Sequence, residues 1–346
     1  MRLWSLQSLA HGADGILHFR WRTCRFGAEE YWCGILDHDS VPRRRYDEAK
    51  QEGAELARLS PKVLGTHVHI DVGILHSPEQ DDAHRALPHG LPTPSEAAAH
   101  LYRELWLRKC AVGYVNSRDR FDGLKLLVLP HWAMCDAALA EKLTAYVQAG
   151  GTLLIGGRSA IKTMHNTVHA ETPPGPLATL AGVTVEEYGM HPERHYRIQL
   201  AREVAPALWY DWLKPSTAGV LGTWQSGAGE PAPGHLADGA AVTRNAWGRG
   251  ACLYVGTYLA PETAGWIADL ALREAGVTPL VAGAPAAVEV VLRRSDERSL
   301  LFLLNHDQVE HRVTGIPSGV ELLRNAPVED SVRLAAWQVA IIEVGS

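Results

Sequence analysis

The sequence lacks any apolar run that approaches the roughly eighteen residues of a transmembrane helix. We also expect no secretion signal, because Ser5, Gln7 and Ser8 interrupt the first apolar run and no A-x-A cleavage pattern follows it. The sequence also lacks a segment dominated by charge of one sign: the net charge is −6, acidic and basic residues are interleaved, and there is no basic stripe. These absences argue against membrane and nucleic-acid partners.

Closely spaced cysteines are also absent. The five cysteines are odd in number and lie far apart at Cys24, Cys33, Cys110, Cys135 and Cys252. Without a C-x-x-C pair, neither a zinc ribbon nor a redox pair is predicted. This spacing does not fit a disulfide framework. It fits a protein of a reducing compartment, so we expect a cytoplasmic protein.

The usual motifs for nucleotides and nucleophiles are missing. The glycine pairs at positions 150–151 and 156–157 form neither G-x-G-x-x-G nor a P-loop, so no nucleotide cofactor is predicted. Cys135 follows a predicted strand, but Ala133 and Ala137 stand where a nucleophile elbow carries glycine, and no H-x-E partner follows. We therefore expect no cofactor and no cysteine nucleophile.

The composition that is present is that of a folded globular protein. Of the 346 residues, 46% are hydrophobic and 21% charged, and the length exceeds one ordinary core, so we expect two or three domains. Eleven tryptophans are a high number. Tryptophan fills cores, but an indole face also stacks on sugar rings, and composition alone favours neither explanation.

The first sixty or so residues predict one β/α unit. Residues 5–10 resemble the end of a helix stopped by Gly12, and residues 15–21 a short, buried parallel strand. A loop rich in glycine and aromatic residues then leads to Pro42, where a helix begins whose apolar positions recur at spacings of three and four up to Leu59. This order is typical of an α/β barrel or a doubly wound sheet.

The middle of the chain alternates strands and helices. Strands are predicted at residues 67–75, 112–115, 124–129 and 152–155, a loop at 77–92, helices from Thr93, from Asp136, at 178–185 and at 262–275, and a hairpin at 247–257. This alternation predicts a parallel sheet covered by helices. After residue 285, short β-prone runs recur at intervals of about ten residues, which predicts a small antiparallel sandwich.

One loop crowds carboxylates and aromatic rings together. Glu29 and Glu30 precede Tyr31 and Trp32, and such a mixture is suited to sugar hydroxyls and ring faces. A retaining glycosidase needs two carboxyl groups about 5–5.5 Å apart across the bond, which adjacent residues do not readily supply. We therefore interpret the pair as a binding or loop-fixing element, with a plain solvated loop as the alternative.

A second polar pattern lies at His67-Val68-His69-Ile70-Asp71. On a strand, both imidazoles would share one face, as in metal-dependent hydrolases. The neighbouring histidines at 76 and 84 fall in a predicted loop instead of on a second strand end. A metal-dependent hydrolase using His67, His69 and Asp71 therefore stays an alternative, beside the simpler interpretation of two histidines at a sheet edge.

Together these segments resemble glycoside hydrolase family 42, the β-galactosidases of the A4 type. LQSLAHGADGILHFRWR resembles the strand that closes their (β/α)8 barrel, and GAEEYWCGILDHD with RRRYDEAKQEGAEL the loop and helix after it. The run from DGLKLLVLP to GGTLLIGGRSAIK, continued by PGPLATLAGVTVEEY, is similar to their flavodoxin-like trimerisation domain, which is related to glutamine amidotransferases. LLFLLNHD and VAIIE resemble their C-terminal β-domain.

The resemblance implies three domains. Residues 1–61 would be the last β/α unit of the barrel, 62–284 the amidotransferase-like trimerisation domain, and 285–346 a C-terminal β-sandwich. Family members often have G-A-E-x-x-H in the loop, where the Glu and His hold galactose hydroxyls. Glu29 matches that Glu, and Trp32 stands at the His position, so both are predicted to contact sugar, while galactose specificity is in doubt.

The function expected from this resemblance is that of a C-terminal part of a β-galactosidase. The family's two catalytic Glu residues lie on earlier barrel strands, so the chain alone is predicted to be inactive, a split or truncated product or a subunit that completes a barrel. Its expected partners are a β-galactoside or another carbohydrate, and two further copies in a homotrimer or a chain supplying the barrel. A non-enzymatic oligomerisation or carbohydrate-binding module is the alternative. Residues 1–59 are expected to be poorly ordered, or docked on the middle domain or a neighbouring subunit.

Overall fold

The computed structural model describes residues 1–190, 196–201, 203–225 and 236–345. These form two compact units: a terminal unit, Met1–His69 with Pro279–Ser346, and a middle unit, Ile70–Thr278. The strand predicted at residues 67–75 is wrong, because the chain changes sheets there. β1 (His67–Val68) pairs with the C-terminal strand β13, whereas β2 (Val72–Leu75) joins the parallel sheet of the middle unit.

The middle unit is built on a parallel sheet. Its five parallel strands lie in the order β3 (Val112–Val115), β2, β4 (Leu126–Leu129), β5 (Thr152–Gly156) and β12 (Gly250–Val255). Side chains alternate between two cores along each strand: Val128 packs in one core and Leu129 in the other. The predicted parallel sheet is confirmed.

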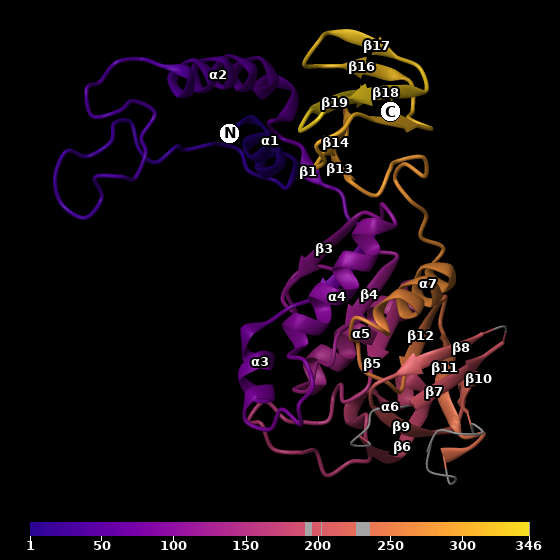
Figure 1. Ribbon diagram of the computed structural model, residues 1–346. Helices are drawn as coiled ribbons and strands as arrows, with labels where there is room; N and C mark the ends of the chain where they lie inside the picture. Colours follow the sequence, from indigo (N-terminus) through magenta and orange to yellow (C-terminus); the bar gives the residue numbers. More distant parts are fainter. Residues whose placement is uncertain (191–195, 202, 226–235, 346) are drawn as a thin grey trace. The chain divides into compact units, whose positions relative to one another are not determined.

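Helices cover both faces of this sheet (Figure 1). One core takes residues from α4 (Pro94–Leu107) and α7 (Ala264–Ala275), and the other from α5 (Ala137–Gln148) and α6 (Ala178–Ala181). The helix starts predicted at Thr93 and Asp136 are confirmed, because both side chains accept a backbone N–H of the first turn. The predicted loop at 77–92 instead contains α3 (Pro78–Arg85), which has proline at its first position and acidic residues in its first turn.

An antiparallel extension follows the parallel strands. The hairpin predicted at 247–257 is right in its turn and its second arm, β12, but its first arm, β11 (Ala240–Trp247), lies before the predicted range. The further strands are β10 (Gly219–Trp224), β7 (Tyr196–Leu200), β8 (Val204–Ala207), β9 (Tyr210–Pro215) and β6 (Val183–Gly189). The helix predicted at 178–185 ends early, because Gly182 adopts a φ of 66° and the chain enters β6. Sequence analysis did not anticipate the strands from β6 to β10.

The terminal unit contains the predicted C-terminal β-domain. Its six-stranded sheet has the order β1, β13 (Val288–Arg294), β14 (Ser299–Asn305), β19 (Val339–Val344), β16 (Gly319–Glu321) and β17 (Ala326–Val328). All of its pairings are antiparallel. A second pair, β15 (His311–Thr314) with β18 (Ser331–Leu334), contributes Val313 and Leu334 to the core on one face.

The N-terminal segment, residues 1–63, covers the opposite face of that sheet. Leu6 of α1 (Arg2–Ala10) and Leu59 of α2 (Arg44–Val63) share a core with Phe302 and Ile341. Burying two such leucines contributes about 2 kcal/mol each. Docking on the middle domain was the wrong expectation, because the C-terminal sheet offers the apolar face that these helices need.

Two buried polar side chains on β13 hold this contact. Glu289 accepts hydrogen bonds from His11 and His306, both at 2.7 Å, and from Gln7 at 2.8 Å. Arg293, 1% exposed, donates to the carbonyl oxygens of Leu9 at 2.6 Å and Thr66 at 2.7 Å. Buried charges need such partners, and here the N-terminal segment supplies them.

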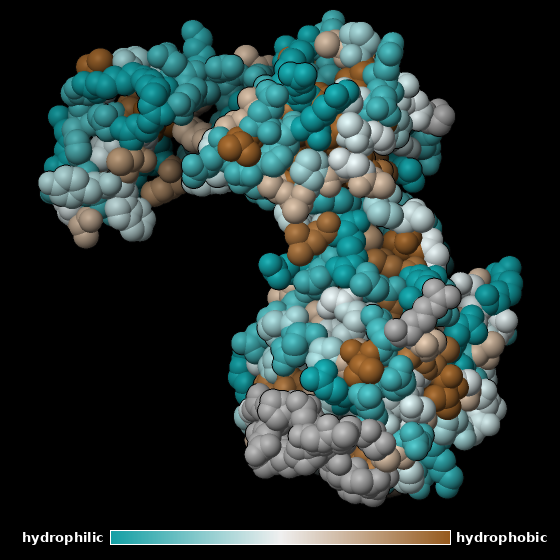
Figure 2. Space-filling model, turned by 45° about the vertical axis from the view of Figure 1, so that its right-hand side comes forward, coloured by the Kyte–Doolittle hydropathy of each residue, from teal (hydrophilic) through white to brown (hydrophobic). Residues whose placement is uncertain are grey.

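The stretch at residues 15–21 departs from its predicted form. It is irregular, with bends at Phe19 and Trp21, and belongs to no strand, and Leu17 is 96% and Phe19 72% exposed. Among the described residues no strand pairs with it, so its apolar side chains face solvent instead of a barrel core. Figure 2 shows a mostly hydrophilic face with small, separate hydrophobic groups, and no described helix is long and apolar enough to cross a membrane.

Candidate functional site

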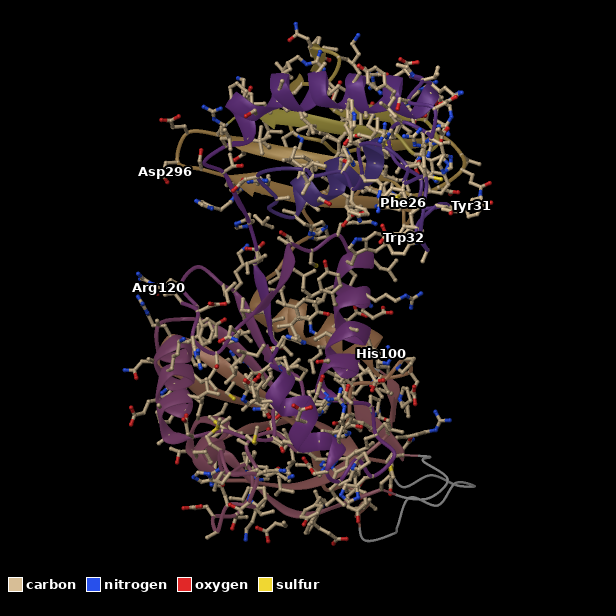
Figure 3. The ribbon with its side chains drawn as sticks, turned by 90° about the vertical axis from the view of Figure 1, so that its left-hand side faces the viewer. Phe26, Tyr31, Trp32, His100, Arg120 and Asp296 are labelled. Carbon is tan, nitrogen blue, oxygen red and sulfur yellow. The ribbon has the colours of Figure 1, made fainter. Side chains whose placement is uncertain are left out.

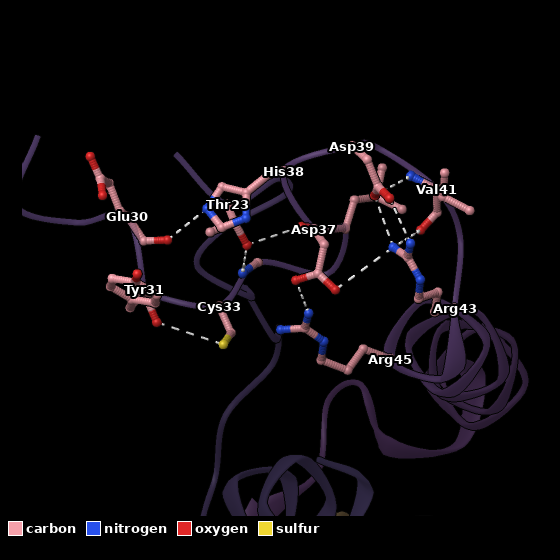
Figure 4. Close-up of polar contacts among 12 residues, drawn as sticks. Thr23, Glu30, Tyr31, Cys33, Asp37, His38, Asp39, Val41, Arg43 and Arg45 are labelled. Carbon is pink, nitrogen blue, oxygen red and sulfur yellow. Dashed lines mark hydrogen bonds and ion pairs between the residues drawn. The ribbon is translucent and has the colours of Figure 1, made fainter. Parts of the chain in front are cut away.

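The loop of residues 20–36, called loop 20–36 below, is closed by a clip at its base. The Thr23 N–H donates to the Leu36 carbonyl at 3.0 Å, and the Leu36 N–H to the Trp21 carbonyl at 2.8 Å. The buried Thr23 hydroxyl accepts the Gly34 N–H at 2.9 Å. Gly34 is required by close approach, because a Cβ there would lie 2.7 Å from the backbone of Arg22 and Thr23. Figure 4 shows this base. Residues 24–33 are therefore presented from a fixed anchor.

Glu29 is tied to a single cation. Arg20 Nη2 donates to Glu29 Oε2, and the side chains are 18% and 46% exposed, respectively. The Arg20 guanidinium also lies 4.8 Å from the centre of the Phe19 ring. A carboxylate has two oxygens and about four acceptor positions, so Glu29 retains the capacity to accept hydroxyl protons. Arg22, from the same loop, donates instead to the Ser40 hydroxyl at 3.3 Å.

Trp32 lies on the same turn as Glu29. Its backbone N–H donates to the Glu29 carbonyl at 3.2 Å, and its side chain is 59% exposed. Phe26 and Tyr31, 78% and 88% exposed, come from the same loop (Figure 3). The structure thus places the two predicted residues on one turn, with an exposed Trp32 and a half-exposed Glu29 carboxylate. Such a pair can stack on a ring and accept its hydroxyls.

The other carboxylates near this loop are fixed by arginines. Asp37 pairs with Arg45, and Asp39 accepts Arg43 at 2.6 and 2.8 Å (Figure 4). Hydrogen bonds from these arginines are the largest influence on both aspartates and hold the pKa of each below its usual range. They stay ionised at neutral pH, so they orient the loop and do not serve as proton donors.

A cavity of about 340 Å³ lies beside this loop, lined by α1, residues 16–20 and residues 33–35. Arg20 belongs both to its wall and to the ion pair with Glu29. Trp4 and Phe19 line it as well and are 73% and 72% exposed. Neither Glu29 nor Trp32 lines this cavity. The candidate sugar contacts therefore lie on the outer turn of loop 20–36.

The structure gives the metal-site alternative no geometric support. His67 and His69 belong to the terminal unit and Asp71 to the middle unit. The buried Asp71 carboxylate lies 3.2 Å from the Lys125 ammonium. Among the described residues, no group of three or more His, Cys, Asp or Glu side chains is arranged to hold a metal ion. The Cys135 thiol is fully buried, and burial raises its pKa to about 12, which leaves no thiolate for catalysis.

Sequence analysis missed one polar group in the middle unit. Arg158, Trp209 and Asp211 line a single cavity although they lie far apart in the sequence. The available signal was weak: a carboxylate within a Trp-Tyr-Asp-Trp run, and an arginine directly after a glycine pair that ends a strand.

Comparison with known protein families yields three matches in chain order. The family models described as β-galactosidase, β-galactosidase trimerisation domain and β-galactosidase C-terminal domain match residues 1–59, 70–278 and 287–343, respectively. The first and third matches fall within the terminal unit, and the second coincides with the middle unit.

Curated relatives match along most of this chain. β-Galactosidase BgaB of a Geobacillus strain is 32% identical over 317 residues, 90% of this chain and 46% of the relative. β-Galactosidase LacZ of Heyndrickxia coagulans is 30% identical over 352 residues, 99% of this chain and 51% of the relative. The chain thus spans about half the length of the curated relatives it matches.

Solved structures agree in fold. A β-galactosidase from Bacillus circulans sp. alkalophilus aligns with a TM-score of 0.89 at 23% identity, over 99% of this chain and 52% of the other. A β-galactosidase from the Antarctic haloarchaeon Halorubrum lacusprofundi aligns with a TM-score of 0.80 at 27% identity, over 99% of this chain and 49% of the other.

Proposed function

The chain belongs to glycoside hydrolase family 42, the β-galactosidases, and from this premise we propose that it supplies one wall of the sugar site together with the assembly domain of such an enzyme. The reaction proposed for the completed protein is hydrolysis of terminal β-D-galactosides with retention. Residues outside these 346, on the same polypeptide or on another, would contribute the rest of the barrel and its two catalytic carboxylates.

One observation carries this proposal. The N-terminal segment is anchored on the C-terminal sheet, yet it keeps Trp4, Leu17, Phe19 and Trp21 between 62% and 96% exposed. An apolar surface of this kind on an anchored segment marks an interaction site. Barrel strands packing beside residues 15–21 would cover that surface.

Within this wall, Glu29 and Trp32 are the proposed sugar contacts. Arg20 positions Glu29, and a backbone hydrogen bond places Trp32 on the same turn, so a carboxylate and an indole are offered by one short segment. Where family relatives often carry a histidine, the indole would replace a hydrogen bond by stacking. We therefore propose that the sugar is bound with less dependence on one hydroxyl than in those relatives.

In the family, the two catalytic Glu residues lie on earlier barrel strands, outside these 346 residues, so we propose that the chain alone is inactive. The test is an assay of the purified 346-residue chain with a chromogenic β-galactoside. No turnover above a heat-denatured sample is expected. Sustained turnover by the chain alone, abolished by Glu29→Gln, would show that a complete site is present and would overturn this part of the proposal.

The proposed assembly is a homotrimer formed by the middle unit. The match of residues 70–278 to the trimerisation-domain model supports it. Light scattering after size-exclusion chromatography is expected to give three times the chain mass of 37.8 kDa at micromolar concentration. A monomer at that concentration would contradict the trimer while leaving the sugar-site proposal intact. A trimer that remained inactive after barrel completion would favour the alternative, a non-enzymatic assembly module.

We also propose a cytoplasmic location. All five cysteines are free thiols, three of them buried, and a reducing compartment preserves such thiols. Thiol titration of the protein purified under non-reducing conditions is expected to find five reactive groups after unfolding. A result with disulfides at Cys24 and Cys33 would count against this location.

A further inference from the structure

The middle unit contains a cavity of about 350 Å³ that the proposed galactosidase role does not use. It lies past the carboxyl end of β5, where Gly156 leads to Arg158, and Tyr254 near the end of β12 also lines it. In open α/β sheets, ligands bind in crevices outside the carboxyl ends of the strands. The position alone makes this cavity a candidate site.

Arg158 forms its cationic wall. Its backbone φ is 63°, a left-handed conformation unusual for an arginine. The guanidinium lies 5.4 Å from the Trp209 ring centre, and its Nη1 atom is buried without a hydrogen-bond partner among the described residues. A buried donor without an acceptor costs about 1–3 kcal/mol, more when charged. A bound acceptor would remove that cost.

Two further basic side chains line the same cavity. Lys162 donates to Asn166 at 2.7 Å, and His89 lies at the cavity wall. Burial is the main cause that lowers the pKa of both groups, and the charge of Arg158 adds to it. Basic groups whose positive charges lower one another's pKa in this way are stabilised by an anion that binds between them.

The cavity's carboxylate, Asp211, is already engaged. Its two oxygens accept Trp209 Nε1 at 2.7 Å and the Tyr254 hydroxyl at 2.8 Å. The charges of Asp211 and Arg158 attract one another, yet Arg158 Nη1 has no hydrogen-bond partner among the described residues. Burial raises the pKa of Asp211 to about 6, so its negative charge is itself poorly stabilised. Arg158 Nη1 therefore remains available to an external anion.

An aromatic flank completes the cavity. Tyr188 and Trp209 stack with ring centres 6.0 Å apart and an angle of 16° between the planes. Tyr188 is 63% exposed, whereas Trp209 is 4% exposed, so the stack joins an exposed ring to a buried one. Met190 and Val168 add apolar lining. A flat or ring-shaped group can pack on this flank.

We propose that this cavity binds a small organic anion, with a carboxylate or phosphate head at Arg158 Nη1 and a ring against Tyr188 and Trp209. The site lies wholly within residues 70–278 and requires no barrel residue. Binding is therefore independent of galactosidase activity, and failure of one proposal leaves the other standing.

The test is isothermal titration calorimetry of the full 346-residue chain with four probes. Phenyl phosphate and benzoate carry both head and ring, inorganic phosphate carries the head alone, and benzyl alcohol carries the ring alone. Saturable binding with one site per chain is expected for at least one of the first two, and their ratio separates a phosphate from a carboxylate ligand. Benzyl alcohol is expected to bind at least about tenfold more weakly.

Three variants assign the binding to this cavity. Arg158→Gln is expected to weaken the better anion at least about tenfold, and Arg158→Lys to restore part of that loss. Tyr188→Ala, at a largely exposed position, should weaken phenyl phosphate and leave inorganic phosphate unchanged. Arg120→Gln, an exposed arginine of the same unit (Figure 3), is the matched control and should bind like the wild type.

Circular dichroism establishes that each variant is folded. If Arg158→Gln does not fold, the contrast between the two probes in Tyr188→Ala decides the question alone. The proposal is overturned if neither aromatic anion binds below about 10 mM, if benzyl alcohol binds as tightly as benzoate, or if folded Arg158→Gln binds the anion like wild type.

Discussion

The N-terminal segment and the middle unit use tryptophan in opposite ways. In the segment, Trp4 and Trp32 are 73% and 59% exposed, whereas in the middle unit Trp224 and Trp209 are 1% and 4% exposed. Both regions contain tryptophan, so composition does not distinguish them. The packing around each tryptophan does. The middle unit is thus closed on itself, while the segment keeps an open aromatic surface.

The cause lies in the layers available to each region. The parallel sheet of the middle unit has helices on both faces, so its aromatic side chains find neighbours within the unit. In the segment, α1 and α2 pack on the C-terminal sheet, but the residues between them have no layer of their own. The comparison shows that α1 and α2 anchor the segment on the C-terminal sheet. The residues that connect these two helices are left exposed.

The largest predicted effect contrasts two tryptophans. Trp224→Ala removes a buried ring that contacts Tyr196 and Tyr210 and donates to the Asp211 carbonyl at 3.2 Å, so we expect a loss of about 4 kcal/mol in the unfolding free energy of the middle unit. Trp32→Ala should change the unfolding free energy by about 0.5 kcal/mol or less. Denaturant titration followed by circular dichroism measures both. Equal losses of unfolding free energy in the two variants would contradict the distinction between the middle unit, where tryptophan is buried, and the N-terminal segment, where it is exposed.

The second prediction concerns the anchor of the segment. Arg293→Met leaves the Leu9 and Thr66 carbonyls without a buried donor, and we expect a loss of about 3 kcal/mol in the stability of the terminal unit. Hydrogen exchange should rise in α1 and β13 and stay unchanged in β5. Arg294→Met, at the exposed neighbouring position, is the matched control. Unchanged protection of α1 in Arg293→Met would disprove the anchor.

The third prediction separates the units by pH. Burial raises the folded-state pKa of Asp211 to about 6, above its unfolded value of about 4. Ionisation of Asp211 therefore destabilises the middle unit above pH 6, and this carboxyl alone contributes roughly 2 to 3 kcal/mol of stability as pH falls from 6 to 4. Buried His131 of the same unit, whose pKa burial lowers to about 3, acts in the opposite direction over this range. The pH dependence of exchange in β5 should therefore differ between the wild type and Asp211→Asn, which lacks the Asp211 contribution. An identical pH dependence in the two proteins would contradict this.

In the terminal unit, Glu289 contributes a pH dependence of stability that is opposite in sign to that of Asp211. Burial alone would raise its pKa, but hydrogen bonds from His11 and His306 outweigh burial and hold the pKa below its usual value. A depressed folded-state pKa stabilises above the unfolded value of about 4.3 and loses that contribution as pH falls below it. Exchange in β14 should therefore rise below pH 4, and Glu289→Gln should flatten that rise.

The smallest effect is predicted for the loop's surface pairs. Arg43 and Asp39 are about half exposed, at 50% and 51%, so Arg43→Gln should leave the midpoint of thermal unfolding essentially unchanged. Thermal unfolding at low and high salt measures this. A clear drop in the midpoint at both salt concentrations would mean that the loop is packed like the middle unit.

Much of the middle unit could be predicted from local sequence. The run Leu126–Leu129 lacks polar residues, as a strand buried on both faces requires, and Thr93 with Glu96 marks a helix start. The strands from β6 to β10 escaped prediction because each is short and gains its stability from neighbours distant in sequence.

The docking of the segment could not be predicted, because the pattern on β13 is misleading. Glu289, Val291 and Arg293 share one face, and two charged residues of three indicate a solvent-facing side. The structure buries that face, since His11, Gln7 and backbone carbonyls of the segment satisfy both charges.

The candidate site was predictable only in part. Glu29 and Trp32 lie three residues apart, so one turn brings them together. Arg20 meets Glu29 only because the clip between Thr23 and Leu36 folds the loop back, and no local motif encodes that clip. Arg158 and Asp211 are distant in sequence, and only the packed sheet joins them in one cavity.

The most direct test of the central claim is complementation. The 346-residue chain is mixed or fused with the preceding barrel portion of a family relative such as BgaB, and hydrolysis of a chromogenic β-galactoside is measured. We predict no turnover from either part alone and clear turnover from the pair, reduced at least about tenfold by Glu29→Gln and unaffected by Glu48→Gln. Turnover that is absent from the folded pair, or identical with Glu29→Gln, would contradict the account of this segment as a wall of the sugar site.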